Sequence, residues 1–233
     1  MWLVRHGEVT SYLGDHGLTD RGAAQAREAA AALAPALGTD AEVDLRHATS
    51  ARASGTAEVL GAALRGARVR LSAPNPDPGF DNFRVDLGGQ VRPHDAMRLA
   101  LAGAPDGDGP PPTWRAEGTR FARIHDGGGD PITWWLTQPT LAYEPAAHVV
   151  RRFWRALGDV AAAGTAETVV CTHSGPMRAL AAQALGRDPG EPEHLEHVEV
   201  RMSGAHAGAA AQLSYRGHTV PLALPRLEEP AWS

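Results

Sequence analysis

Two histidines stand directly after short apolar segments, one near each end of the chain. The first lies in Arg-His-Gly-Glu at residues 5–8, and the second lies in Thr-His-Ser-Gly-Pro at residues 172–176. If both apolar segments are parallel strands of one sheet, both histidines fall at the edge where open α/β sheets bind their ligands. We therefore expect His6 and His173 to share one site.

A third motif places an arginine in the first turn of an expected helix. Arg52 follows Ser50, a residue type that caps helices, and opens the run Arg-Ala-Ser-Gly-Thr-Ala at residues 52–57. Together with Arg5 it would offer forked guanidinium donors, which bind phosphate oxygens in pairs, and the helix N-terminus would add the positive end of its dipole. This pattern predicts a pocket for a phosphate dianion.

A neutral imidazole beside such a phosphate can attack phosphorus and form a phosphohistidine, which divides one displacement into two easier steps. Neighbouring arginines keep the ring neutral by lowering its pKa, and a second histidine can donate to the oxygens on which charge develops. Gly7 and Gly175 lack a Cβ and would let the backbone approach the ligand. We expect no metal and no other cofactor, since arginines supply the positive charge. The His-Leu-Glu-His sequence at 194–197 has metal-like spacing but no evident third ligand.

The elements that must position these residues alternate between strand and helix. Strands are predicted over 2–5, 43–47, 68–71 and 168–172, and two more strand-like stretches lie between 197 and 224. Helices are predicted over 19–37, 50–64, 144–163 and 175–185. The expected fold is therefore α/β, a three-layer sandwich with a mostly parallel central sheet.

The middle of the chain breaks this alternation. Residues 75–89 are rich in Pro, Gly, Asp and Asn, and residues 101–113 contain a Pro-Asp-Gly-Asp-Gly-Pro-Pro-Pro run that predicts a loop. We interpret about 75–140 as an insertion over the carboxyl ends of the strands, within a single domain of 233 residues. Helices are expected in it near 95–101 and 114–125.

Composition narrows the range of partners. Hydrophobic residues make up 43% of the chain and charged residues 21%, as in ordinary soluble domains, and the net charge is -5. Without a basic excess, neither nucleic acid nor a membrane surface is expected as a partner. The one cysteine, Cys171, excludes an intrachain disulfide. No leader and no long apolar segment is evident, so a cytoplasmic location is expected.

The motifs, in their order along the chain, resemble the histidine phosphatase superfamily, the phosphoglycerate-mutase-like enzymes. The resemblance covers about residues 1–72 and 144–190. It rests on Arg-His-Gly-Glu at 5–8, Leu-Thr-Asp-Arg-Gly at 18–22, the run at 52–57 and His-Ser-Gly at 173–175.

The resemblance implies a role for each matching position. His6 would be the phosphorylated nucleophile, and Arg5, Arg52 and His173 would form the rest of the phosphate pocket. Ser174 and Gly175 would bring backbone close to the phosphate. The resemblance also implies that a carboxylic acid after the third strand protonates the leaving oxygen and then activates water.

The sequence departs from the family pattern at this acid. Relatives usually carry a Glu a few residues before a Gly in this region, and no Glu lies between residues 71 and 89. Asp81 and Asp86 are the candidates, and Asp81 is favoured because it follows a Pro-Gly turn. Glu8 could instead be the acid, although a role in orienting Arg5 or a histidine is preferred.

The sequence therefore predicts a phosphatase that acts on small phosphomonoesters, with inorganic phosphate as its product or inhibitor. Two alternatives stay open. A phosphomutase would return the phosphoryl group to another oxygen, and a noncatalytic module would bind a phosphate ligand after losing the acid. No motif in the insertion identifies the substrate, and the sequence does not indicate an oligomeric state.

Overall fold

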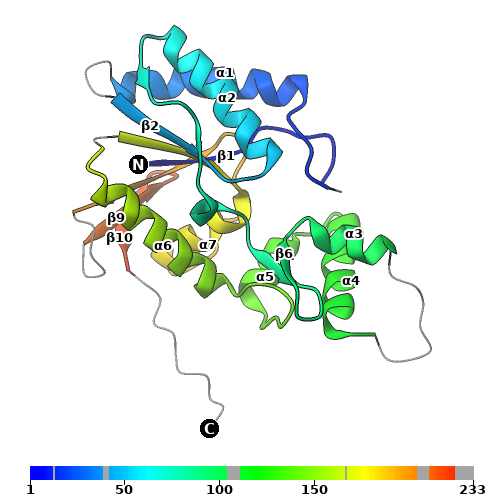
Figure 1. Ribbon diagram of the computed structural model, residues 1–233. Coiled ribbons are helices and arrows are strands. Elements are labelled where there is room, and N and C mark those ends of the chain that lie inside the picture. The colour runs from blue at the N-terminus through cyan, green and yellow to red at the C-terminus, as the bar shows by residue number, and fades with distance from the viewer. Residues whose placement is uncertain (13, 39–41, 104–110, 166, 204–209, 224–233) are drawn as a thin grey trace.

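A central β-sheet with helices on both faces organises the chain (Figure 1). The computed structural model describes residues 1–12, 14–38, 42–103, 111–165, 167–203 and 210–223. Helices α1 (Asp20–Leu37) and α2 (Ala51–Gly66) cover one face of the sheet. Helices α6 (Ala146–Ala162) and α7 (Ser174–Leu185) cover the other face. The predicted three-layer α/β fold is confirmed.

The centre of the sheet is parallel, as predicted. Strands β1 (Trp2–Arg5), β7 (Glu167–Thr172) and β2 (Glu42–His47) lie side by side with β7 in the middle. Two short strands, β3 (Arg70–Leu71) and β4 (Asn75–Pro76), also pair with β2 in parallel. The carboxyl ends of all these strands therefore meet at one edge of the sheet.

The central strands are apolar because helices bury both of their sides. Leu3 and Val170 face the core under α6 and α7, whereas Val4 and Val169 face the core under α1 and α2. All four side chains are fully buried. A parallel strand that is covered on both faces needs a continuous apolar run rather than alternation.

An antiparallel extension completes the sheet beside β1. It consists of β8 (His197–Met202), β9 (Ala211–Tyr215) and β10 (His218–Leu222). The sequence predicted only two strand-like stretches here. A two-residue turn joins β9 and β10, and both of its residues, Arg216 and Gly217, have positive φ. A turn of this kind matches the twist of paired antiparallel strands. It joins β9 directly to β10, so two short strands form where the sequence predicted a single stretch.

Helices α1 and α2 begin at the caps that the sequence predicts. The side chains of Thr19 and Ser50 each accept a hydrogen bond from the backbone N–H three residues later, at 2.9 and 3.4 Å. Helix α1 ends at Gly38, whose φ of 70° lies in the left-handed region that favours glycine. Local side-chain chemistry thus sets where the helices start and stop.

Two predicted boundaries are wrong for identifiable reasons. The third strand was expected over 68–71, but Arg68 has a φ of 68° at the end of α2, and only Arg70–Leu71 pair with β2. The helix expected from residue 144 begins later, at Ala146. Glu144 instead accepts hydrogen bonds from Arg152 and from the backbone of Arg84.

The insertion at 75–140 contains more regular structure than the sequence predicts. The two expected helices are α3 (Ala96–Gly103) and α4 (Thr113–Asp126). The structure adds η1 (Pro78–Phe80), the hairpin of β5 (Arg84–Asp86) and β6 (Val91–Pro93), and α5 (Pro131–Thr137). Most of the loop expected over 101–113 lies outside the described residues.

Aromatic side chains join the insertion to the rest of the chain. Trp135 stacks on Phe83 with ring centroids 4.4 Å apart, and both belong to the same buried cluster as Leu3 of β1 and Phe153 of α6. One buried cluster therefore includes residues of the insertion, the sheet and α6. Figure 1 shows α3, α4 and α5 gathered together on one side of the sheet.

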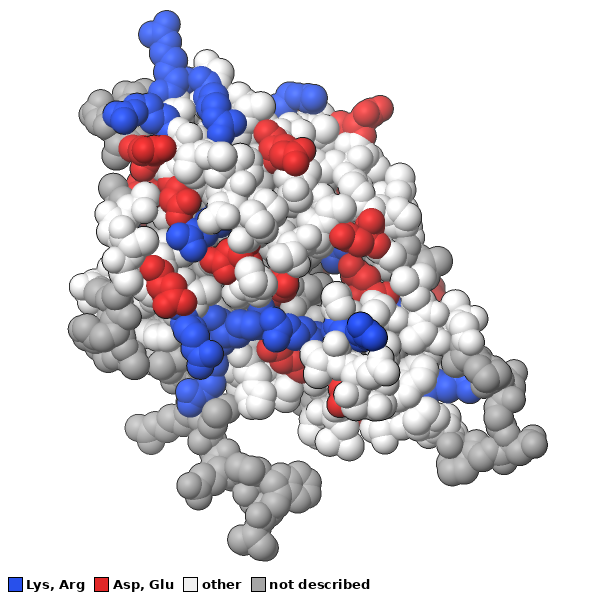
Figure 2. Space-filling model, in the orientation of Figure 1, with Lys and Arg blue, Asp and Glu red and all other residues white. Residues whose placement is uncertain are grey.

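The outer surface carries mixed charge. On the face shown in Figure 2, a row of basic side chains crosses the centre, and acidic side chains lie above and below it. The described part of this face therefore presents no extended surface of one sign. Within the described residues, no helix combines the length and the apolar character needed to cross a membrane.

Candidate active site

His6 follows β1 and is buried, with 2% of its surface exposed. Its Nδ1 lies 2.8 Å from the carbonyl oxygen of Gly7. A carbonyl oxygen can only accept, so Nδ1 carries the proton of the neutral ring and Nε2 keeps its lone pair. Burial, with a further contribution from Arg52, lowers the His6 pKa to about 3. The ring is therefore neutral at physiological pH, with Nε2 available as a nucleophile.

Backbone hydrogen bonds fix the loop that carries His6. The His6 N–H donates to the carbonyl of Thr172 on β7 at 2.9 Å, and the Gly7 N–H donates to Oγ1 of Thr56 on α2 at 3.0 Å. A Cβ on Gly7 would lie 2.7 Å from the carbonyl oxygen of Gly22 on α1. Gly7 is therefore required for close packing against α1, a different reason from the ligand approach that the sequence suggested.

His173 follows β7 and lies next to His6, with ring centroids 5.3 Å apart. Its Nε2 lies 3.2 Å from Oγ of Ser50, the cap of α2. Burial, with a further contribution from Arg52, lowers the His173 pKa well below its usual range. If the Ser50 hydroxyl donates to Nε2, the proton of the neutral ring lies on Nδ1, which can then donate to a ligand.

The two predicted arginines contact partners of opposite charge. Arg5 pairs with Glu191 at 3.2 Å and donates to the carbonyl of Pro192. Arg52 is held by two carboxylates, Asp95 and Asp15, neither of which the sequence singled out. Both guanidinium groups are buried and adjoin the two histidines, so the structure brings all four predicted residues to one place.

Among the buried nitrogens near His6 that have no hydrogen-bond partner in the described structure, three belong to predicted pocket residues: Nε of Arg5, Nε of Arg52 and Nδ1 of His173. A fourth is Nε2 of His194, whose ring lies 6.0 Å from that of His6. Unpartnered buried donors are rare in folded proteins, because each costs about 1–3 kcal/mol, and each calls for an explanation such as a bound ion. An oxyanion accepts hydrogen bonds from such donors.

The N-terminus of α7 adds backbone donors to the same place. His173 stands at the cap position but makes no side-chain cap bond, so N–H groups of the first turn, at Ser174 and Gly175, keep capacity for a ligand. A Cβ on Gly175 would lie 2.8 Å from the ring of Phe83. Glycine is needed here because the loop after η1 packs closely against the helix start.

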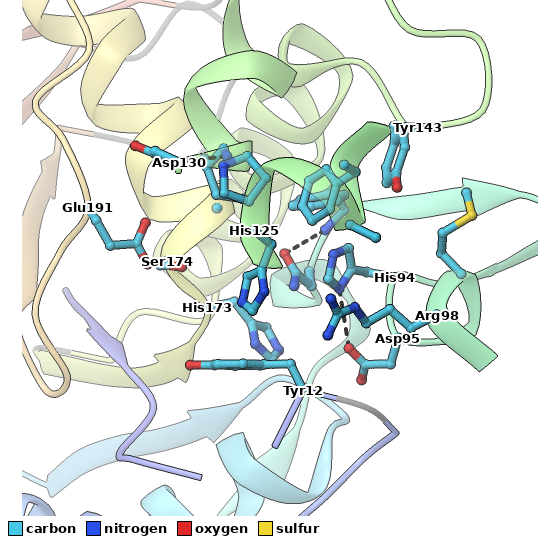
Figure 3. A pocket seen from close by; sticks show the side chains of 18 of the residues that line it. Tyr12, His94, Asp95, Arg98, His125, Asp130, Tyr143, His173, Ser174 and Glu191 are labelled. Carbon is cyan, nitrogen blue, oxygen red and sulfur yellow. Dashed lines mark hydrogen bonds and ion pairs between the residues drawn. The ribbon is translucent and has the colours of Figure 1, made fainter. Parts of the chain in front are cut away.

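A pocket of about 400 Å³ opens over these residues, and we call it the main pocket (Figure 3). Arg5, His6, Arg52, His173, Ser174 and Gly175 line one end, which we call the phosphate end. The remainder includes mostly apolar or aromatic side chains from the insertion and the loops: Tyr12, Phe83, Met97, Phe121, Ile132 and Tyr143. In Figure 3, Asp130 and Glu191 lie on one side, and His94, Asp95 and Arg98 lie on the other.

A second hollow, the side pocket, adjoins the phosphate end. Its volume is about 630 Å³. Both pockets are lined by a shared set of five residues, Arg52, Asn82, His94, Asp95 and His173. The two pockets therefore adjoin at these residues.

The three acid candidates from the sequence lie in different surroundings. Asp81 accepts from the backbone N–H and the hydroxyl of Thr49 at 2.7 and 2.9 Å, and it lines the side pocket. Asp86 caps the turn of the β5–β6 hairpin and lines neither pocket. Glu8 accepts from the hydroxyl of Thr19 instead of contacting Arg5 or a histidine. Of these three candidates, Asp81 alone lines one of the two pockets.

Sequence reasoning missed the residue that holds the Asp81 loop. Arg152 of α6 donates to the carbonyls of Gly79, Asp81 and Asn82 at 2.9–3.0 Å, and it pairs with Glu144. In the sequence it stands in a run of basic residues that has the appearance of a solvated helix face. No local signal distinguishes it, because its partners lie about seventy positions away.

The two histidines with metal-like spacing face different ways. The His194 ring lies 6.0 Å from that of His6, whereas His197 packs edge-on against Trp2 at 5.1 Å. Across the described residues, no cluster of three His, Cys, Asp or Glu side chains has the proximity needed to hold a metal ion.

Comparisons with known proteins identify a family and structures of similar fold. The model of the histidine phosphatase superfamily (branch 1) matches residues 1–74 and 114–208. No curated protein matches the chain in sequence.

Several solved structures share the fold. One described as mycobacterial hydrolase 1 has a TM-score of 0.59 at 17% identity, over 94% of this chain and 98% of the other. A mycobacterial glucosyl-3-phosphoglycerate phosphatase in complex with inorganic phosphate has a TM-score of 0.59 at 16% identity, over 94% and 96%. Mycobacterial hydrolase 2 has 0.58 at 18%, over 94% and 91%.

Proposed function

The chain belongs to the histidine phosphatase superfamily, and from this premise we propose that it is a phosphomonoester hydrolase that forms a phosphohistidine on His6. The observation that carries the proposal is the set of three unpartnered donors, on Arg5, Arg52 and His173, around a neutral imidazole. A phosphoryl group has oxygens for all three donors and a phosphorus atom for Nε2.

The reaction has two displacements. In the first, Nε2 of His6 attacks phosphorus, the bond from phosphorus to the leaving oxygen breaks, and that oxygen takes a proton. In the second, water attacks phosphorus and the bond to Nε2 breaks, which releases inorganic phosphate. Arg5, Arg52 and His173 bind the oxygens in both steps, together with the N–H groups of Ser174 and Gly175.

The Nδ1 hydrogen bond supports the first displacement. As Nε2 bonds to phosphorus, the ring gains positive charge, and the Gly7 carbonyl already accepts from the Nδ1–H that carries it. The ring is held in this orientation before substrate binds, so little reorganisation is needed. His6 thus combines a free lone pair with a fixed direction of attack.

The leaving group would occupy the rest of the main pocket. Phe121 stacks on Tyr143 with centroids 5.2 Å apart, and Met97 and Ile132 add apolar surface. The aromatic part of this lining favours a flat or apolar leaving group, which packs against the rings without needing hydrogen-bond partners. It also favours hydrolysis over mutase activity, since a mutase must hold and turn a hydroxylated acceptor.

A phosphate-release assay tests the proposed function. Aryl phosphates and a panel of metabolite monoesters are offered to the wild type and to His6→Ala, with chelator present throughout. We expect chelator-resistant release by the wild type and none by the variant. Equal release by both proteins would exclude His6 as the nucleophile. Tight phosphate binding without release would favour the noncatalytic binding module instead.

A further inference from the structure

Asp95 lies just before α3, inside the insertion, and contacts Arg52 of α2. Its two carboxylate oxygens accept from Nη1 and Nη2 of Arg52 at 3.0 and 3.1 Å. Nδ1 of His94 lies 3.3 Å from the same carboxylate. Only 13% of the Asp95 side chain and 3% of the Arg52 side chain are exposed. A paired geometry of this kind fixes the carboxylate in distance and direction.

The nitrogen atoms of Arg52 therefore fall into two groups with different roles. Its Nη atoms hold Asp95, while its Nε is one of the three buried donors assigned above to the phosphoryl group. The guanidinium is planar and rigid, so a phosphoryl oxygen on Nε lies on a different edge of the group from the Asp95 carboxylate. Asp95 is therefore held by the same side chain that would bind the phosphoryl group.

Asp95 also lines both pockets, the main pocket, which would receive the leaving group, and the side pocket. In a double displacement the attacking water takes the position that the leaving oxygen has vacated, so one carboxyl group beside that position can serve both steps.

The other two carboxylates that line the main pocket also pair with arginines, and both contact Arg178. Asp130 caps α5 and pairs with Arg178, and Glu191 bridges Arg5 and Arg178. The loop after η1 presents Asn82 to the pocket, and an amide has no acidic proton to give.

We propose that Asp95 is the proton donor and acceptor of the reaction, in place of the carboxylate that the sequence placed at Asp81. This assignment rests on the proposed function. In the first step the Asp95 carboxyl proton passes to the leaving oxygen as the bond between phosphorus and that oxygen breaks. In the second step the Asp95 carboxylate takes a proton from water as the water oxygen bonds to phosphorus and the bond to Nε2 breaks. Asp95 thus returns to the protonated state in which it entered the first step.

The charge state of Asp95 changes with occupancy of the site. Burial is opposed by hydrogen bonds from His94 and Arg52, and the net effect lowers the Asp95 pKa to about 2 in the unliganded protein. Asp15, also on Arg52, faces the same guanidinium. A phosphoryl dianion on Arg52 offsets the positive charge that holds the Asp95 pKa down and adds negative charge beside it. Both changes raise that pKa. The proposal requires that the carboxyl take up a proton in the complex.

Leaving-group dependence tests the assignment on the full chain. Asp95→Asn is compared with wild type on a series of aryl and alkyl phosphates whose leaving groups differ in basicity. We expect roughly 10²–10⁴-fold loss of kcat/KM for alkyl phosphates, and a much smaller loss for p-nitrophenyl phosphate, which leaves without a proton. A loss of equal size across the series, or no loss, would overturn the assignment.

A second measurement tests the step in which water hydrolyses the phosphohistidine. With p-nitrophenyl phosphate, Asp95→Asn is expected to give a burst of one p-nitrophenolate per enzyme and then slow turnover, because the phosphohistidine forms but is not hydrolysed. Intact mass would show the enzyme carrying one phosphoryl group. A variant that shows neither the burst nor the phosphorylated species would contradict the assignment.

Asp81→Asn and Glu191→Gln are the matched controls, since each removes one carboxylate charge near the site. Neither should change the leaving-group dependence, and a selective loss in Asp81→Asn would return the role to Asp81. Failure of the proposed function would look different, because the wild type itself would then release phosphate without a phosphorylated His6.

Discussion

His6 and His47 make the same local hydrogen bond at the ends of two strands of the same sheet. Nδ1 of His6 contacts the carbonyl of Gly7 at 2.8 Å, and Nδ1 of His47 contacts the carbonyl of Ala48 at 2.9 Å. Both rings are buried, but only His6 lines the main pocket beside the unpartnered donors. Chemistry at His6 therefore depends on its surroundings rather than on its local backbone.

This pair of histidines gives a matched test of the nucleophile. We expect His6→Ala to lose at least about 10³-fold in kcat for an aryl phosphate, since the covalent route is removed. His47→Ala should keep kcat within about 10-fold, with whatever stability loss follows from the lost packing. Steady-state kinetics and thermal melts on both variants measure the two effects separately. Similar losses of kcat in the two variants would contradict the assignment of His6 as the nucleophile.

Acid should destabilise the fold through His6. Its folded pKa is about 3, below the unfolded value near 6.5, so the unfolded state binds the proton first as pH falls. The stability contributed by the neutral ring is complete above the unfolded pKa and is lost progressively below it, toward the folded pKa. Between pH 7 and pH 5 the expected loss from His6 alone is about 2 kcal/mol.

Denaturant unfolding at a series of pH values measures this effect. His6→Asn cannot take up the proton, so its free energy of unfolding should fall by about 2 kcal/mol less than that of the wild type between pH 7 and pH 5. Parallel pH curves for the two proteins would contradict the lowered pKa.

Replacing Arg152 should reduce both stability and activity, although the residue stands in a run of basic residues. Arg152→Ala leaves three loop carbonyls and Glu144 without their partner, and a cost of about 2–4 kcal/mol in unfolding free energy is expected. Activity should fall too, because Asn82 on this loop lines the main pocket. Arg155→Ala, on the exposed side of α6, should stay within about 0.5 kcal/mol of wild type. Equal effects in the two variants would contradict the role of Arg152.

The main pocket should select for flat apolar leaving groups. We expect kcat/KM for naphthyl phosphate to exceed that for a hexose phosphate by at least about 10-fold, from burial of the ring against Phe121. Phe121→Leu keeps an apolar side chain but removes the flat face, and should reduce the naphthyl preference while leaving methyl phosphate turnover unchanged. A competition assay with both substrates measures the ratio. A wild-type preference for the sugar phosphate would contradict the apolar assignment.

The sequence predicts the parallel core and the phosphate end because both depend on local signals. Strand 168–172 is a continuous apolar run, Thr19 and Ser50 are capping residues, and strand ends at one sheet edge bring His6 and His173 together. These features require only the neighbouring residues and the rule that parallel strands end on the same side.

The parts that the sequence does not predict depend on contacts between distant segments. Asp95 reaches Arg52 across forty-three positions, and Arg152 reaches Asp81 across seventy-one. Neither pairing has a motif, since an acidic residue before a helix and an arginine on a helix are common anywhere. The start of helix α5 does carry a sequence signal, since Asp130 is a capping residue and Pro131 is favoured at the first helical position. The helix is short and lies among loops, so the signal does not stand out.

A covalent phosphoryl group at His6 is the central requirement of the proposed mechanism. The direct measurement is to quench the wild type within a turnover of an aryl phosphate, keep the sample alkaline because phosphohistidine is labile to acid, and locate the added phosphoryl group by mass spectrometry of peptides. We expect the group on the peptide that contains His6, and its absence from the same peptide of His6→Ala. A wild type that turns over with no phosphorylated peptide, or with the group on His173, would contradict the account.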